Sequence, residues 1–109
     1  MTRESLPPIF STLGDRPDLQ EAVDRFVIGL AEAIDRIQDA EAASDLEQVA
    51  ARCRVLAEEA QSHGYRGLAD LSEAAAQASD QDKPELVVGH LRHMTQISCR
   101  VRRGHRGSA

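Results

Sequence analysis

The side chains of this 109-residue chain that could do chemistry are four histidines and two cysteines. His90 and His93 stand three residues apart, a spacing at which two imidazoles could share a metal. No Glu-x-x-His pair, no CxxC motif and no facing carboxylate accompanies them, and a metal site in a helical bundle draws its ligands from several helices. A Ser-His-Asp or Cys-His arrangement and a glycine-rich phosphate loop cannot be identified either. We therefore predict no metal, no cofactor and no catalytic residue, and we expect the protein not to be an enzyme.

These groups have structural interpretations instead. We predict Cys53 and Cys99 to be reduced and buried, because both fall at helix-core spacing. His63 lies beside a glycine at a predicted helix end, where we expect a capping or surface role. His90 flanks an apolar stripe, so we expect it at the edge of the core. Whether His63, His90 or His93 has any further role stays open.

The elements that must position these residues are helices. Apolar residues recur every three or four positions, β-branched runs are absent, and only three residues are aromatic, so the core must be aliphatic and rich in alanine. We predict an all-α fold, an antiparallel up-down-up-down four-helix bundle with short loops. The expected helices cover residues 17–40, 44 to 62 or 63, 67–78, and 84 to about 102–104.

Residues at the helix ends refine this prediction. Ser44 and Glu47 match a capping box, Gly64 suits a left-handed C-cap, and Asp82 is the expected N-cap of the last helix. Residues 1–16 form a lead-in with one short helical turn that would place Ile9, Phe10 and Leu13 on the bundle. The four-helix domain is expected over residues 17–104, followed by a disordered tail at 105–109, which contains His105.

The charge of the chain is unevenly distributed. Residues 1–90 carry 8 Lys/Arg against 18 Asp/Glu, a net of −10, whereas residues 91–109 carry five arginines and no acid. An acidic body is a poor partner for nucleic acid, and we interpret the basic end as complementing a helix dipole. There is no signal peptide and no run of about 18 apolar residues, so we expect a cytoplasmic protein without a membrane partner.

The stretch from Leu46 to Leu71, LEQVAARCRVLAEEAQSHGYRGLADL, carries a family pattern. The pattern reads H-x-L-K-G-x-A, then three residues, a Gly, and a Leu four residues after that Gly. Aligned without gaps, its Leu, Ala, Gly and final Leu correspond to Leu56, Ala60, Gly64 and Leu68. Upstream, residues 15–46 are similar to an opening helix with a D-x-P-D-L start. In these features the chain resembles the histidine-containing phosphotransfer (HPt) domains of two-component phosphorelays, over about 90 of its 109 residues. The resemblance implies a four-helix bundle that docks onto receiver domains.

The chain departs from that pattern at the site itself. Arg54 stands at the position of the phospho-accepting His, and Ala57 and Glu58 replace the Lys and Gly that follow. A guanidinium is not a nucleophile at neutral pH, because its pKa exceeds about 12. The resemblance therefore implies an HPt-like module that is incompetent in phosphotransfer and acts by binding a receiver domain or a histidine kinase. The implied partner-binding residues are Arg54, Ala57, Glu58 and Gln61.

Other interpretations stay open at this point. Arg54 can be an exposed helix residue that pairs only with Glu58 at i+4. The chain can be a small helical adaptor or dimerisation subunit unrelated to phosphorelays, which binds through an apolar patch around Ile28 and Val55. It can also be an active phosphotransfer protein that uses another histidine. The sequence names neither the partner nor the pathway, and it does not give the oligomeric state.

Overall fold

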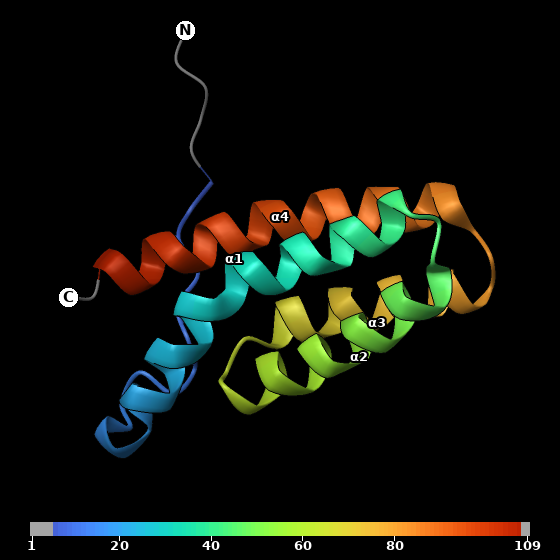
Figure 1. Cartoon of the computed structure of the whole chain (residues 1–109). Helices are drawn as coiled ribbons and strands as arrows, with labels where there is room; N and C mark the ends of the chain where they lie inside the picture. Colours follow the sequence, from blue (N-terminus) through green and yellow to red (C-terminus); the bar gives the residue numbers. More distant parts are fainter. Residues whose placement is uncertain (1–5, 108–109) are drawn as a thin grey trace, which may run out of the picture.

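The structure, a computed structural model, describes residues 6–107. It contains four α-helices, α1 (Gln20–Ala42), α2 (Leu46–Ser62), α3 (Arg66–Asp80) and α4 (Pro84–Gly107), with a 3₁₀ turn, η1 (Pro17–Leu19), ahead of α1. The described residues include no strand, which confirms the predicted all-α class. Each helix packs against the next one in the chain, and α1 also packs against α4 (Figure 1). The four helices therefore enclose one core.

The core is aliphatic, as the composition predicted. α1 contributes a ladder with steps of three and four residues, and every member of it is at most 3% exposed. Where α2 faces α3, the buried residues are mostly alanines, whose small side chains let two helices approach closely. The main buried residues of these three helices are Val23, Val27, Leu30, Ile34, Ile37, Val49, Ala50, Leu56, Ala60, Leu68, Ala75 and Ala76.

The three connections between helices share one geometry. In each, a residue with positive φ follows the end of a helix: Ser44 at 59°, Gly64 at 85° and Asp82 at 56°. The amide of the next residue donates to a carbonyl five positions back, as in Tyr65 N to Ala60 O at 2.9 Å. This is the Schellman arrangement, in which a left-handed residue ends the helix. The prediction that Gly64 ends α2 in the left-handed conformation is confirmed, with Gly64 directly after the C-cap residue His63.

Two predicted N-caps are wrong for the same reason. Ser44 ends α1 in the left-handed conformation, and the N-cap of α2 is Asp45, whose carboxylate accepts from the amide of Gln48 at 3.2 Å. Asp82 likewise ends α3, and the amide of Val87 donates to the carbonyl of Lys83. Short polar residues suit both the N-cap and the left-handed position, so their types do not distinguish the two roles.

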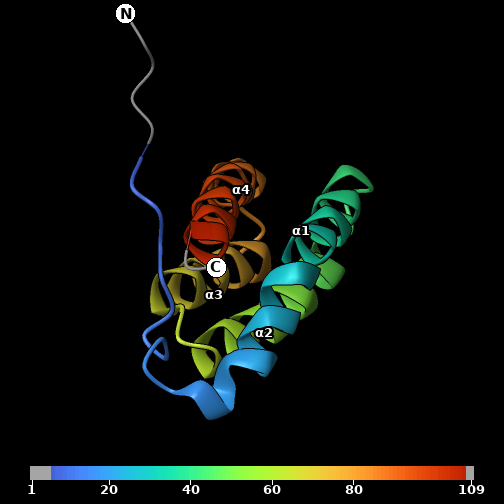
Figure 2. The ribbon, with the colours of Figure 1, turned by 90° about the vertical axis from the view of Figure 1, so that its left-hand side faces the viewer.

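The lead-in is an extended strap and not a helical turn. Residues 6–11 have no regular structure, and turns follow at 12–15. Pro7 and Pro8 favour this, because proline lacks an amide donor and disfavours helical angles in the residue before it. Ile9 packs against the core, but Phe10 is 59% exposed. We call residues 6–13 the N-terminal strap, which Figure 2 shows in blue beside α3 and the end of α4.

The strap ties α4 to the connection between α2 and α3. Its backbone amides at Ile9 and Thr12 donate to the carbonyls of Arg100 and Gly64, each at 3.0 Å. Arg100 Nε donates to Pro7 O at 2.9 Å, and Arg103 donates to the carbonyl of Leu6. The basic end of the chain therefore holds the strap, a role that the sequence did not indicate.

The last helix is longer than predicted. α4 continues through residues 105–107, where we expected a disordered tail, and residues 108–109 of that predicted tail lie outside the described residues. Val101 is fully buried, and His105 Nε2 lies 3.3 Å from Asp24 Oδ1 on α1. These contacts with the strap and with α1 support the extra turn. Within residues 6–107 no helix has the length and apolar character to cross a membrane.

Candidate functional site

Arg54 lies on the exposed side of α2 and reaches across to α3. Its Nη2 donates to Asp80 Oδ2 at 2.5 Å, and its Nε lies 3.7 Å from Glu73 Oε2. Glu73 and Asp80 are seven residues apart, so both project from the same face of α3. The hydrogen bond to Asp80, with the negative charges of both acids, raises the pKa of Arg54 above its ordinary value. A guanidinium is charged at every physiological pH even without such partners, so these contacts fix its position and not its charge.

This pairing differs from the local alternative in which Glu58 neutralises Arg54. Among the described residues, the ion-pair partners of Arg54 are the two acids on α3. The Arg54 side chain remains 44% exposed, so solvent screens both interactions. A competing anion can reach the guanidinium at little energetic cost.

The other predicted partner-binding residues divide into two groups. Glu58 and Gln61 are exposed on α2 and follow Arg54 at steps of four and three, which places all three on one face. Ala57 is 9% exposed and counts among the buried residues. The structure therefore brings Arg54, Glu58 and Gln61 together on the surface, and it places Ala57 beneath them.

His63 is the C-cap of α2, the capping role that the sequence predicted. Its ring stacks on Phe26 of α1, with centroids 5.0 Å apart and 7° between the planes. Its Nδ1 lies 2.6 Å from the carbonyl oxygen of Glu59. A carbonyl oxygen only accepts, so Nδ1 carries the proton of this hydrogen bond and Nε2 is the unprotonated nitrogen in the neutral ring.

His90 and His93 do not form a site with other groups. His90 is half-buried, as predicted, and His93 is exposed. Over residues 6–107, no three His, Cys, Asp or Glu side chains gather in a way that could hold a metal ion.

The two cysteines have different environments. Both are free, but only Cys53 is buried, and the prediction that Cys99 is buried is wrong. Cys99 follows the buried Ser98 directly, and a step of about 100° around α4 turns it towards solvent. Burial raises the pKa of the Cys53 thiol to about 12, against a smaller opposite effect of the Arg54 charge. The thiolate form of Cys53 is therefore absent near neutral pH.

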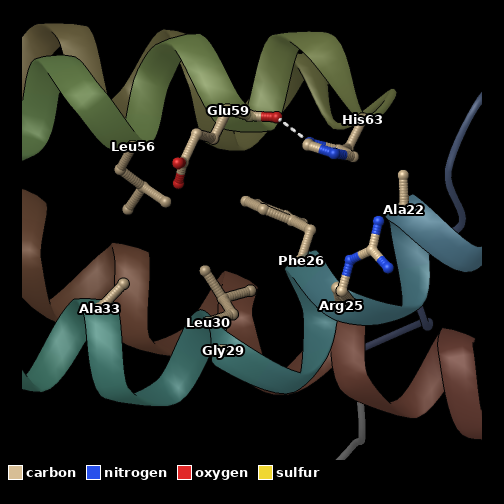
Figure 3. Close-up of a pocket in the computed structure, with 9 residues that line it drawn as sticks. All are labelled: Ala22, Arg25, Phe26, Gly29, Leu30, Ala33, Leu56, Glu59 and His63. Atoms are coloured by element: carbon tan, nitrogen blue, oxygen red, sulfur yellow. Dashed lines mark hydrogen bonds between the residues drawn. The ribbon is translucent and has the colours of Figure 1, made fainter.

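A second surface feature, which the sequence reasoning missed, lies between α1 and α2. Two adjoining hollows of about 310 and 450 Å³ share Ala33, Leu56 and Glu59 in their linings. We call them together the α1–α2 groove. Figure 3 shows its first hollow, with Phe26 and Glu59 pointing into it from the two helices and Arg25 on the α1 side. A signal for it was present: Ala22, Gly29 and Ala33 recur at steps of seven and four along one side of α1.

The α1–α2 groove and Arg54 lie on different sides of α2. Arg54 faces α3, whereas the groove is lined on α2 by Arg52, Val55 and Glu59, which face α1. The predicted apolar patch is also divided. Val55 is 55% exposed and lines the groove, while Ile28, at 77% exposed, is not part of its lining.

Comparisons with protein-family models, with curated proteins and with solved structures find no match to this chain.

Proposed function

We propose that the chain is an HPt-like signalling module of a cytoplasmic two-component phosphorelay that cannot carry a phosphoryl group. In this proposal the helices form the antiparallel up-down-up-down bundle of the family, and the module acts by binding a receiver domain or a histidine kinase. The observation that carries it is the position and state of Arg54. The residue aligned with the family's phospho-accepting histidine is exposed on α2, and it is a charged guanidinium that donates to Asp80.

A charged guanidinium can serve binding where it cannot serve catalysis. Arginine donates two parallel hydrogen bonds to a carboxylate or a phosphoryl group, and the phosphorylation pocket of a receiver domain is acidic. In the complex, Arg54 would exchange Asp80 for a receiver carboxylate or an aspartyl-phosphate. The two exposed pairs on α3 would keep the side chain extended across the surface until the partner arrives.

Phosphoryl acceptance can be tested without knowing the partner. Phosphoramidate transfers its phosphoryl group to an accessible imidazole nitrogen and releases ammonia. The exposed His93 can take up label chemically, so the readout is the position of the label, read by mass spectrometry of peptides. We expect the triple variant Arg54→His/Ala57→Lys/Glu58→Gly, which restores the family pattern, to gain an acid-labile phosphoryl group at residue 54. A folded triple variant that stays unlabelled at residue 54 would contradict the resemblance. Label on the wild-type chain that passes on to a receiver domain, and is lost in His63→Gln, His90→Gln or His93→Gln, would show an active protein that uses another histidine.

Binding is tested with the receiver and kinase domains of the source organism. We expect at least one of them to bind in titration calorimetry, and Arg54→Glu to weaken that complex at least tenfold. Arg66→Glu is the matched control, because Arg66 is also exposed and begins α3. Equal loss in both variants would mean that only net charge matters, and no binding to any of these domains would refute the proposal.

The adaptor hypothesis keeps one observation in its favour, the exposure of Ile28 and Val55. If this function applies, sedimentation velocity will show a dimer that Ile28→Glu or Val55→Glu dissociates.

A further inference from the structure

The α1–α2 groove has the size and the open floor that a docked helix requires. The groove extends along α1 from Ala22 to Ile37, about 22 Å at a rise of 1.5 Å per residue, which matches a partner helix of about 15 residues. Its floor holds small residues, and a Cβ placed on Gly29 would meet no atom within 4 Å. Another helix can therefore approach α1 closely at this point.

The apolar part of the groove is continuous but narrow. Val55 is more than half exposed beside the buried Leu56, and Phe26 is partly buried at the end where it stacks on His63. An amphipathic helix could cover these side chains with one apolar stripe. A fully apolar helix would leave most of its own surface in water.

The lining of the groove is richer in basic residues than the acidic body around it. Residues 1–90 hold eight Lys/Arg and 18 Asp/Glu, yet the groove lining includes three of those arginines and only one of the acids, Glu59. Arg25 and Arg36 stand eleven residues apart on α1, about 16 Å at the helical rise, and Arg52 faces them from α2.

These arginines are available to a partner. Arg25 and Arg36 contact Glu21 and Glu32 one turn away, at 3.6 and 2.9 Å, in exposed pairs that solvent screens. Arg52 makes no ion pair with any residue in the described range 6–107. At physiological salt the Debye length is about 8 Å, so exposed acidic residues farther than this from the groove barely oppose an anion seated in it.

We propose that the α1–α2 groove binds an amphipathic helix of a partner protein whose apolar stripe is flanked by Asp and Glu. The stripe covers Val55, Leu56 and Phe26. The flanking acids contact Arg25, Arg36 and Arg52. This surface is separate from the one around Arg54, and the proposal does not depend on the HPt resemblance.

The test uses the full chain and two synthetic 16-residue peptides, each stapled to hold a helix. Both carry the same leucines at steps of three and four, and the flanking positions are Glu in one and Lys in the other. Fluorescence anisotropy measures the Kd of each peptide at low and at high salt. We expect the Glu peptide to bind at least tenfold more tightly than the Lys peptide, with the difference reduced at high salt.

Variants assign the binding to the groove. Arg36→Glu/Arg52→Glu should reverse the preference between the peptides, and Gly29→Trp should abolish binding of both, because the indole would occupy the open floor. Ile28→Glu, outside the groove lining, and Arg54→Glu should leave both Kd values within twofold. Circular dichroism shows whether each variant is folded.

Several results would overturn the proposal. They are equal binding of the two peptides, no binding of either, a preference that survives the double charge reversal, and binding that Gly29→Trp does not change. A dimer of the wild-type chain that Gly29→Trp dissociates would show that a second copy occupies the groove. Loss of receiver binding in Arg54→Glu with peptide binding unchanged would separate this proposal from the proposed function.

Discussion

Gly64 has a left-handed backbone conformation and lies directly against the N-terminal strap, and replacing it with alanine should disturb both features. Its φ is 85°, a region where a side chain costs about 1–2 kcal/mol. A Cβ at this position would also lie 2.9 Å from the backbone nitrogen of Thr12, so the N-terminal strap would have to move. The side-chain oxygens of Ser11 and Thr12 would lie closer still, but a rotamer change that moves them cannot relieve the contact with the backbone nitrogen.

The expected loss of stability follows from the hydrogen bonds between the strap and the end of α2. Moving the strap breaks Thr12 N to Gly64 O at 3.0 Å and Ser11 Oγ to His63 O at 2.7 Å, each worth about 1 kcal/mol net. With the conformational cost, Gly64→Ala should lower the free energy of unfolding by about 3–4 kcal/mol. Domains of this size are typically stable by about 5–15 kcal/mol, so the variant should fold with much reduced stability.

Urea unfolding followed by circular dichroism at 222 nm measures the change, and the chain supplies matched controls. Ser44 has a φ of 59° at the equivalent connection, so Ser44→Gly should raise stability by about 0.5–1 kcal/mol. Gly67→Ala, in the first turn of α3 with open space around the new Cβ, should also raise it by about 0.5–1 kcal/mol. A Gly64→Ala variant within 0.5 kcal/mol of wild type would refute the reasoning.

Three further predictions concern the cap of α2 and the buried thiol. Asp45→Ala removes the acceptor for the Gln48 amide and should cost about 1 kcal/mol, whereas Glu47→Ala, at the position expected to close a capping box, should cost less than 0.5 kcal/mol in the same urea titration. In Ellman's reagent at pH 8, Cys99 of the folded protein should react at once and Cys53 only when denaturant is added; two fast thiols would contradict this. Burial raises the pKa of the Cys53 thiol from 9.0 to about 12, so the neutral thiol contributes its full stability below pH 9 and loses it as the pH rises towards 12. The free energy of unfolding should therefore fall between pH 9 and pH 12. It should fall less in Cys53→Ala.

The helices were predictable because their signals are local. The spacing of Val23, Val27 and Leu30 identifies the buried face of α1 without any tertiary information, and Gly64 is the residue type that a left-handed position favours. The choice between Ser44 and Asp45 as the N-cap was not predictable in the same way. Both residue types can cap a helix, and the decision depends on where the preceding helix ends.

The surface features depend on contacts between distant parts of the chain. The partners of Arg54 lie 19 and 26 residues away on α3, beyond any spacing rule for a single helix, so the sequence suggested the nearer Glu58. The prolines predict only that the strap of residues 6–13 is extended. Its course over the helices is set by hydrogen bonds to residues 52 to 97 positions away. The α1–α2 groove requires two helices side by side, and neither helix alone indicates it.

The N-terminal strap also has a consequence for the order of folding. The three helix connections close loops of a few residues, which form rapidly, whereas the strap contacts close loops of 52 to 97 residues and require α2 and α4 to be in place. The strap should therefore dock after the helices have assembled. In the native protein it can then open as a separate unit, and the amides of Ile9 and Thr12 should exchange with deuterium faster than those in the middle of α1.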